Sequence, residues 1–153
     1  MLDRFERFTL AIFEISHCWH KLAAEAMAKY DLKGPYAIYL IVLRRFPLGI
    51  TASQLCDICS RDKADVSRAV AQMEEKGIIV RKEGTGRYRA LLRLTPAGKA
   101  AADAVAKCAH LAVDRASCGV SDENREIFYQ SLESIMVNLQ QLCEEGLPED
   151  LPD

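Results

Sequence analysis

The stretch from residue 50 to residue 99 limits most strongly what this chain can fold into. Its apolar residues follow helical spacing, then alternate as in strands, then return to helical spacing. The pattern predicts a helix to about residue 59, a turn at Ser60 and Arg61, a second helix over 62–76, and strands over 78–82 and 88–94. Helix, turn, helix and hairpin in this order predict a helix-turn-helix followed by a wing.

Each predicted helix of this stretch has a cap and an inward face. Either Thr51 or Ser53 can cap the first helix, and Asp62 can cap the second, with Asp65 as an acidic capping-box partner. We expect the first helix to bury Leu55, Ile58 and Cys59. We expect the second to bury Val66, Val70 and Met73, with Lys63, Ser67 and Arg68 lying off that stripe.

Long helices are predicted on both sides of this stretch. Residues 3–30 carry apolar residues at alternating spacings of three and four, namely Phe5, Phe8, Ile12, Ile15, Trp19, Leu22 and Ala26. Residues 36–46 are apolar nearly all round, which predicts a buried helix. An Ala-rich helix follows, with Thr95 as its N-cap and Pro96 as its first helical residue. A last helix to about residue 145 repeats the apolar spacing with Phe128, Leu132, Ile135, Leu139 and Leu142. The fold class is therefore mainly α with a small β-hairpin wing.

Charge is distributed unevenly along the chain. Residues 61–99 contain ten Lys or Arg and five Asp or Glu, a balance of +5, whereas the remaining residues balance at −7. A basic module on an acidic body is typical of a protein that meets phosphate with one face, although a solvated charged surface has the same composition.

Other features limit the expected cellular location and functional class of the protein. The first residues, MLDRFERF, mix charges of both signs, and the longest apolar run is too short to cross a bilayer, so we expect a cytoplasmic protein without membrane contact. Its six cysteines are then expected to be thiols. We see no nucleophile elbow, phosphate loop or pair of catalytic carboxylates, and expect neither an enzyme nor a bound cofactor.

The segment KADVSRAVAQMEEKGIIVRK, followed by an Arg-bearing hairpin and LTPAG, resembles the MarR family of winged-helix transcriptional regulators. The resemblance implies a homodimer held by helices in 1–34 and 100–146, a DNA-binding domain over 35–99, and a flexible acidic tail over 147–153. It also implies a regulator, expected to be a repressor, that binds a palindromic operator in double-stranded DNA and is released by a small molecule.

Carried over by position, the second helix of the motif becomes the recognition helix in the major groove. The candidates for DNA contact are Lys63, Ala64, Asp65, Ser67 and Arg68 on that helix and Arg81, Lys82, Arg87 and Arg89 in the hairpin. Arg68 could bond guanine or a phosphate, and Lys63 a phosphate. Asp65 could accept a hydrogen bond from cytosine N4, or serve only as part of the cap.

The wing departs from the family pattern. The usual wing carries an aspartate followed shortly by an arginine, ahead of the Leu-Thr pair. Counting back from Thr95, Gly86 occupies the aspartate position, and the hairpin is about one residue short. The usual aspartate–arginine brace is therefore missing or rearranged here, which places the reach of Arg87 and Arg89 in question.

Three further groups of residues have a functional and a structural interpretation. Trp19, Tyr36 and Tyr39 could line a pocket for an aromatic or phenolic effector, or belong to the core. Cys56 and Cys59 form a CxxC without a second pair, which favours buried structural thiols. His17, His20 and His110 are weak candidates for a metal site. Two rivals to the operator-binding repressor stay open: a thiol- or metal-sensing variant, and a winged helix that binds protein rather than DNA.

Overall fold

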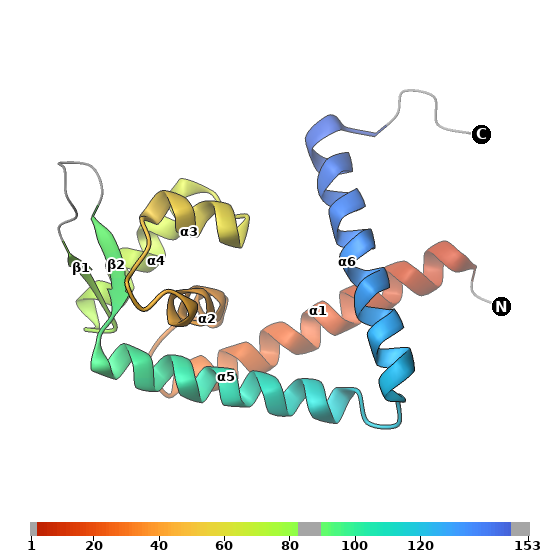
Figure 1. Ribbon diagram of the computed structural model, residues 1–153, viewed down its shortest axis with the longest axis horizontal. Helices are drawn as coiled ribbons and strands as arrows, with labels where there is room; N and C mark the ends of the chain where they lie inside the picture. Colours follow the sequence, from red (N-terminus) through yellow and green to blue (C-terminus); the bar gives the residue numbers. More distant parts are fainter. Residues whose placement is uncertain (1–2, 83–89, 148–153) are drawn as a thin grey trace. The chain divides into compact units, whose positions relative to one another are not determined.

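The computed structural model describes residues 3–82 and 90–147. The chain divides into two compact units, Met1–Leu111 and Ala112–Asp153. Within the described residues the elements are α1 (Arg4–Ala28), the 3-10 turn η1 (Gly34–Tyr36), α2 (Ala37–Arg45), α3 (Ala52–Cys59), α4 (Lys63–Glu75), β1 (Ile79–Lys82), β2 (Leu91–Leu94), α5 (Pro96–Ala116) and α6 (Asp122–Glu145) (Figure 1). The predicted fold class, mainly α with a small hairpin, is confirmed.

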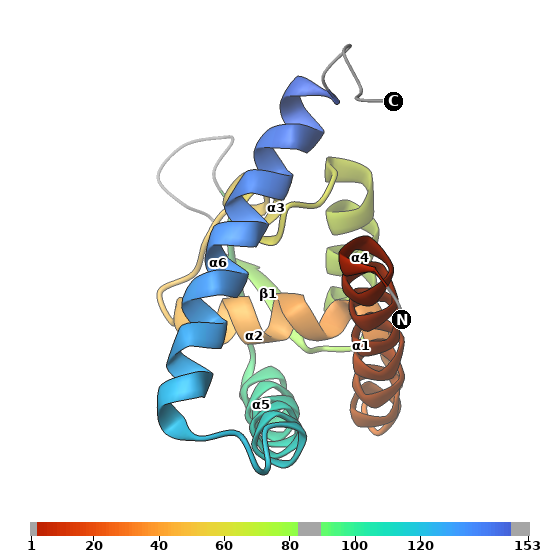
Figure 2. The same ribbon diagram turned by 90° about the vertical axis from the view of Figure 1, so that its right-hand side faces the viewer.

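The core of the first unit is built around α2. This helix buries Ala37, Tyr39, Leu40, Val42 and Leu43, because its sequence is apolar on nearly every side. It packs against α3 and β2, and α3 packs against α4 (Figures 1 and 2). These contacts fix α4 on a rigid base and leave its other face to solvent.

The two helices of the helix-turn-helix start at side-chain caps. Thr51, not Ser53, caps α3: its hydroxyl accepts from Gln54 N–H at 3.2 Å, while Gln54 Oε1 accepts from Thr51 N–H at 2.9 Å. Between α3 and α4 the backbone turns through Ser60, which has a left-handed φ of 49°. The turn is closed by Arg61 N–H, which donates to Cys56 O at 3.1 Å.

The inward face of α3 differs from the prediction. Leu55 is fully buried as expected, but Ile58 is 47% exposed, and Cys56 is buried in its place. Leu55 and Cys56 are neighbours on the helix, and Ile58 lies on the side of Leu55 away from Cys56. The expectation for Ile58 was wrong because hydrophobicity alone does not set the centre of the buried face of so short a helix.

The two strands pair antiparallel, with Ile79 opposite Leu94 and Lys82 opposite Leu91. Ile50 forms a single bridge to Leu92, with Leu92 N–H donating to Ile50 O at 2.8 Å. The first residues of the predicted return strand, Tyr88 and Arg89, lie outside the described residues.

The Leu-Thr-Pro-Ala-Gly segment ties three elements together. The Thr95 hydroxyl donates to Gly77 O at 2.6 Å, just past the end of α4, and accepts from Gly98 N–H at 3.0 Å in the first turn of α5. A Cβ on Gly98 would lie 2.0 Å from Ile78 O, so only glycine permits this close approach. The start of α5 is therefore locked onto the junction between α4 and β1.

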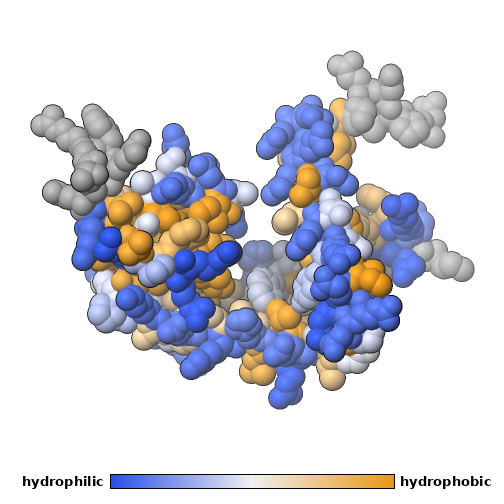
Figure 3. Space-filling view, in the orientation of Figure 1, coloured by the Kyte–Doolittle hydropathy of each residue, from blue (hydrophilic) through white to orange (hydrophobic). Residues whose placement is uncertain are grey.

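The terminal helices expose the apolar stripes that the sequence predicted. On α1, Phe5, Ile15 and Leu22 are 73%, 59% and 47% exposed. In the second unit, α6 buries none of its residues, and Phe128 and Leu139 are 52% and 46% exposed. Figure 3 shows hydrophobic side chains at the surface. Among the residues that the structure describes, no helix is long and apolar enough to span a membrane.

Candidate nucleic-acid interface

Helix α4 divides into a buried and an exposed face. Val66, Ala69, Val70 and Met73 are each at most 1% exposed, as the predicted stripe requires. The opposite face therefore turns to solvent. It presents the side chains of Lys63, Ala64, Ser67 and Arg68 in the first turns of the helix.

A carboxylate and the backbone define the start of α4. Asp65 N–H donates to the Asp62 carboxylate at 2.8 Å, which makes Asp62 the N-cap, as predicted. This hydrogen bond from the backbone lowers the pKa of Asp62, because it stabilises the ionised carboxylate. The Asp62 cap is therefore charged at neutral pH. It fixes the direction of the first helical turn of α4 relative to the loop that joins α3 to α4.

Asp65 and Arg68, three residues apart on α4, form an ion pair. The Asp65 carboxylate was expected to complete a capping box, but it bonds the Arg68 guanidinium instead. Both side chains remain accessible, with 43% of Asp65 and 64% of Arg68 exposed. Arg68, predicted to contact DNA, is thus partly neutralised by a neighbour on the same face of the helix.

The basic residues of the hairpin have different surroundings. Arg81 Nε lies 3.0 Å from both carboxylate oxygens of Glu74, which joins β1 to α4. Lys82, the last residue of β1, is exposed. Arg87, Arg89 and the unusual Gly86 lie outside the described residues, so their predicted role in the wing stays a prediction.

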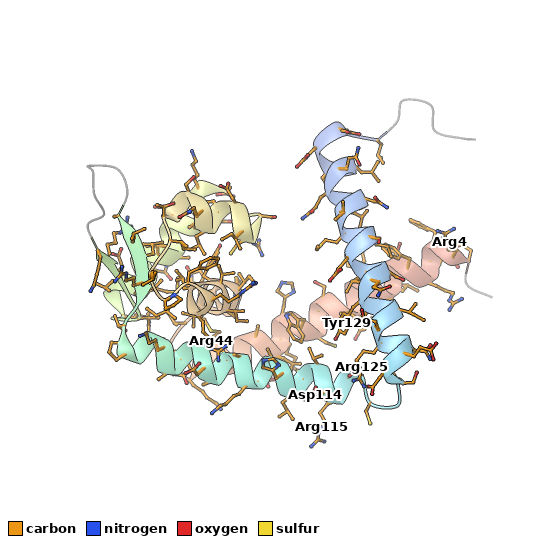
Figure 4. All side chains as sticks on the ribbon, in the orientation of Figure 1. Arg4, Arg44, Asp114, Arg115, Arg125 and Tyr129 are labelled. Carbon is orange, nitrogen blue, oxygen red and sulfur yellow. The ribbon has the colours of Figure 1, made fainter. Side chains whose placement is uncertain are left out.

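The far end of α4 is anchored to the segment that follows α1. Tyr36 Oη donates to Gln72 Oε1 at 2.9 Å, and Lys76 forms an ion pair with Asp31. Arg44 of α2, which is labelled in Figure 4, donates from Nε to Asp103 Oδ1 of α5 at 2.5 Å. These bonds hold the C-terminal end of the candidate recognition helix and tie α2 to α5.

Sequence reasoning did not identify some residues of this region. Arg61 is exposed in the turn directly before α4, and only its place in the basic stretch could have indicated it. Thr95 was assigned only as a cap for α5, because its bond to Gly77 O joins residues 18 apart in the chain. Gln72 gave no signal, since its partner Tyr36 lies 36 residues away.

The three aromatic candidates for an effector pocket have different environments. Tyr36 and Tyr39 are 8% and 3% exposed, and their ring centroids lie 6.1 Å apart. Burial raises the pKa of Tyr39, so its hydroxyl stays protonated at neutral pH. Trp19, on α1, is 43% exposed. The pocket stays a prediction, with the two tyrosines in the core and the tryptophan at the surface.

The thiols and imidazoles show no sign of a shared reactive site. Cys56 is buried, and burial raises the pKa of Cys59, which keeps that thiol protonated and weakly nucleophilic. His20 Nδ1 lies 2.7 Å from Ser16 O in its own helix, while His17 and His110 are exposed. The part of the chain that the structure describes contains no cluster of three or more His, Cys, Asp or Glu side chains suited to a metal ion.

Comparisons with known proteins agree with this geometry. Residues 30–87 match the model of the MarR family. No curated protein sequence is close enough to count as a relative. Among solved structures, a MarR-family transcriptional regulator from Listeria monocytogenes in complex with a 26-mer DNA is similar at a TM-score of 0.83 and 19% identity, over 99% of this chain and 100% of that one.

Two further structures are similar. A MarR transcriptional regulator from Methanosarcina mazei Go1 has a TM-score of 0.79 and 21% identity, over 93% of this chain and 94% of that one. The Staphylococcus aureus MepR–DNA complex has a TM-score of 0.77 and 19% identity, over 86% of this chain and 97% of that one. At these identities the likeness to solved structures establishes the fold.

Proposed function

We propose that the chain is a MarR-family transcriptional regulator, a repressor that binds a palindromic operator in double-stranded DNA as a homodimer, because residues 30–87 match the model of that family. The observation that carries the proposal is the exposed first half of α4, which presents Lys63, Ser67 and Arg68 from a rigidly packed winged helix. The DNA complexes among the structural neighbours support the same mode of binding.

In this proposal α4 enters the major groove with its N-terminal half. Helices of this motif contact base edges with their first residues, which here are Lys63, Ala64, Asp65, Ser67 and Arg68. Lys82, and Arg61 in the turn, reach phosphates and set the position of the domain along the duplex. The excess of basic residues over 61–99 supports these assignments, because phosphate contacts need positive charge on the DNA-binding module alone.

The homodimer is supported by apolar residues that remain exposed in each unit. The stripes of α1 and α6 are helical apolar faces of the kind that pack lengthwise on other helices. We therefore keep 1–34 and 100–146 as the dimerisation helices, 35–99 as the DNA-binding domain and 147–153 as an acidic tail. Two copies with a two-fold axis require an operator with the same symmetry.

Binding across a salt series tests the proposal. Fluorescence anisotropy with genomic fragments or with sites selected from a random pool should show affinity falling steeply as salt rises, since binding releases counterions. Arg68→Ala should weaken binding at least about fivefold. The matched control is Lys107→Ala, an exposed lysine on α5 outside the proposed interface, which should leave the affinity unchanged.

Two outcomes would contradict the proposal. Absent or salt-independent DNA binding would leave the protein-interaction module as the better function for this winged helix. A monomer at micromolar concentration in analytical ultracentrifugation would remove the homodimer, and with it the reason for a palindromic site.

Release by a small molecule is the remaining part of the proposal. Trp19 is the only tryptophan of the chain and is partly exposed on α1, so its fluorescence reports directly on aromatic molecules that bind nearby. A phenolic probe that binds there should quench this fluorescence and weaken operator binding over the same concentration range. Quenching without any effect on DNA affinity would separate the site from regulation.

A further inference from the structure

We infer that Asp65 and Arg68 act together as a specificity element, in which Asp65 restrains Arg68 until DNA offers both side chains new partners. The inference rests on the proposed function, because it concerns how α4 reads DNA. It goes beyond that function by assigning the acidic residue a role: Asp65 penalises DNA that lacks a cytosine amino group at its position. Arg68 then takes guanine O6/N7 or a phosphate.

The first step of the argument is the placement of the two side chains. Positions 65 and 68 are three residues apart and therefore adjacent on the surface of α4. Their ion pair lies beside Ala64, whose small side chain lets other groups approach the helix closely. The pair thus occupies the part of the helix that enters the groove.

The second step concerns the strength of the pair. An exposed ion pair of this kind shifts an equilibrium by at most about fivefold, so DNA can separate it. Separation leaves the Asp65 carboxylate without its cation and close to the negative charge of the duplex. The pair is therefore a weak restraint on Arg68 but a disadvantage at sites that do not offer Asp65 a cytosine amino group.

The third step identifies that donor. A carboxylate only accepts hydrogen bonds at neutral pH. The major groove offers two amino donors, adenine N6 and cytosine N4, and carboxylates typically read cytosine N4, whereas adenine N6 stands beside the N7 acceptor of the same base. Arg68, once released, has guanine O6 and N7 as its preferred base partner. The chemistry of the pair selects cytosine for Asp65, at one base pair in each half-site.

A second pair in the molecule provides the control. Asp122 and Arg125 have the same spacing in the first turn of α6, with Arg125 Nη1 3.0 Å from Asp122 Oδ1. Asp122→Ala removes the same charge and the same kind of ion pair from a residue outside the proposed DNA interface. The Asp122 side chain is 95% exposed and is not part of the apolar stripe of α6 assigned to the dimer. Differences between Asp65→Ala and Asp122→Ala therefore report on DNA recognition rather than on net charge.

The experiment measures affinity for two DNA probes in wild type and in both variants. With an alternating A·T duplex, which contains no cytosine, Asp65→Ala should bind about two- to fivefold more tightly than wild type at 0.1 M salt. Its salt dependence should steepen by about 0.9 in the slope of log K against log salt, because Arg68 becomes free to neutralise one phosphate. Asp122→Ala should match wild type in both measurements.

Selection from a random duplex pool gives the second readout. Wild type and Asp122→Ala should enrich cytosine at one base pair per half-site, and Asp65→Ala should lose that preference. If Asp65→Ala, with unchanged circular dichroism, kept both the salt slope and the base preference of wild type, the inference would be overturned while the proposed function stood. If wild type itself showed no salt-dependent binding, the proposed function would fail. The experiment distinguishes this outcome from a failure of the inference alone.

Discussion

Helices α4 and α6 have the same apolar periodicity and opposite surroundings. The stripe of α4, Val66, Val70 and Met73, is buried inside its own chain, whereas α6 buries none of its 24 residues. Spacings of three and four residues predict a helix with an apolar face. They do not tell whether that face is buried in the same chain, as it is on α4, or stays exposed, as it is on α6.

In the proposed homodimer, this difference divides the molecule into a region whose stability is its own and a region whose stability depends on assembly. The winged helix has a continuous core around the fully buried Leu40, Leu55 and Leu92. The stripe of α6 gains its burial only from another copy in the proposed dimer. Four predictions, from the largest effect to the smallest, test this contrast.

The largest effect is expected from a matched pair of methionines. Met73 on α4 is fully buried, and Met136 on α6 is 52% exposed. Met73→Ala should lower the free energy of unfolding by about 2–5 kcal/mol at any protein concentration, because it leaves a cavity in the core of one chain. Met136→Ala should lower it only at concentrations where the dimer forms. Urea unfolding at two protein concentrations measures both, and equal concentration dependence for the two variants would remove the contrast.

A pair of glycines tests the same contrast at the backbone. Gly98→Ala places a methyl group against Ile78 O and should lower the free energy of unfolding by about 3 kcal/mol, the upper range for an overpacked core. Gly119 has a φ of +87° but open space around it, so Gly119→Ala should cost about 1 kcal/mol through backbone strain alone. Thermal unfolding of both variants checks the order, and a smaller effect at Gly98 than at Gly119 would contradict it.

The Thr95 hydroxyl provides a third test. Thr95→Val keeps the shape of the side chain but leaves Gly77 O and Gly98 N–H without this partner, which should cost about 1–2 kcal/mol. Thr95→Ser retains the hydroxyl and should recover most of the loss. Chemical denaturation followed by circular dichroism compares the two, and equal losses would show that the methyl group, not the hydroxyl, matters at this junction.

The smallest effect concerns pH and the caps of the two helices. The pKa of Asp62 is lowered in the folded protein, so its ionised cap stabilises the fold above the unfolded pKa, about 3.9. That stabilisation should disappear as pH falls through the lower folded pKa. Asp62→Asn should remove this part of the pH dependence between pH 5 and pH 2. The start of α6 is capped by the uncharged Ser121, so Ser121→Ala should leave the pH dependence as in wild type.

The sequence was sufficient for features set by neighbouring residues. The helices, the cap at Asp62 and the stripe of α4 depend on spacings of at most seven residues, and each was predicted. For α3 the sequence offered Thr51 or Ser53 as the cap, and the structure has Thr51. The orientation of α3 was not, because Cys56 and Ile58 are both apolar and only the packing of α2 and α4 decides which one is buried. Bonds between distant residues, such as Thr95 to Gly77 and Tyr36 to Gln72, were outside the reach of any local pattern.

The candidate site likewise contains features that the sequence predicted and features that it did not. That Lys63, Ser67 and Arg68 face solvent follows from the helical repeat and was predicted. The partner of Arg68 was not, because Asp65 could equally have completed the cap, and the choice depends on side-chain geometry. Arg81 was assigned to DNA from its charge alone, whereas its bond to Glu74 shows a residue that also fastens the hairpin to α4.

The distribution of cysteines makes this protein a natural subject for thiol labelling. Cys18, Cys108, Cys118 and Cys143 are exposed, whereas Cys56 is buried and the raised pKa of Cys59 suppresses its thiolate. A maleimide at neutral pH should therefore modify α1, α5, α6 and the turn between the last two, and spare α3. Without any engineered residue, the chain carries reactive cysteines on the helices assigned to dimerisation and none in the helix-turn-helix assigned to DNA binding.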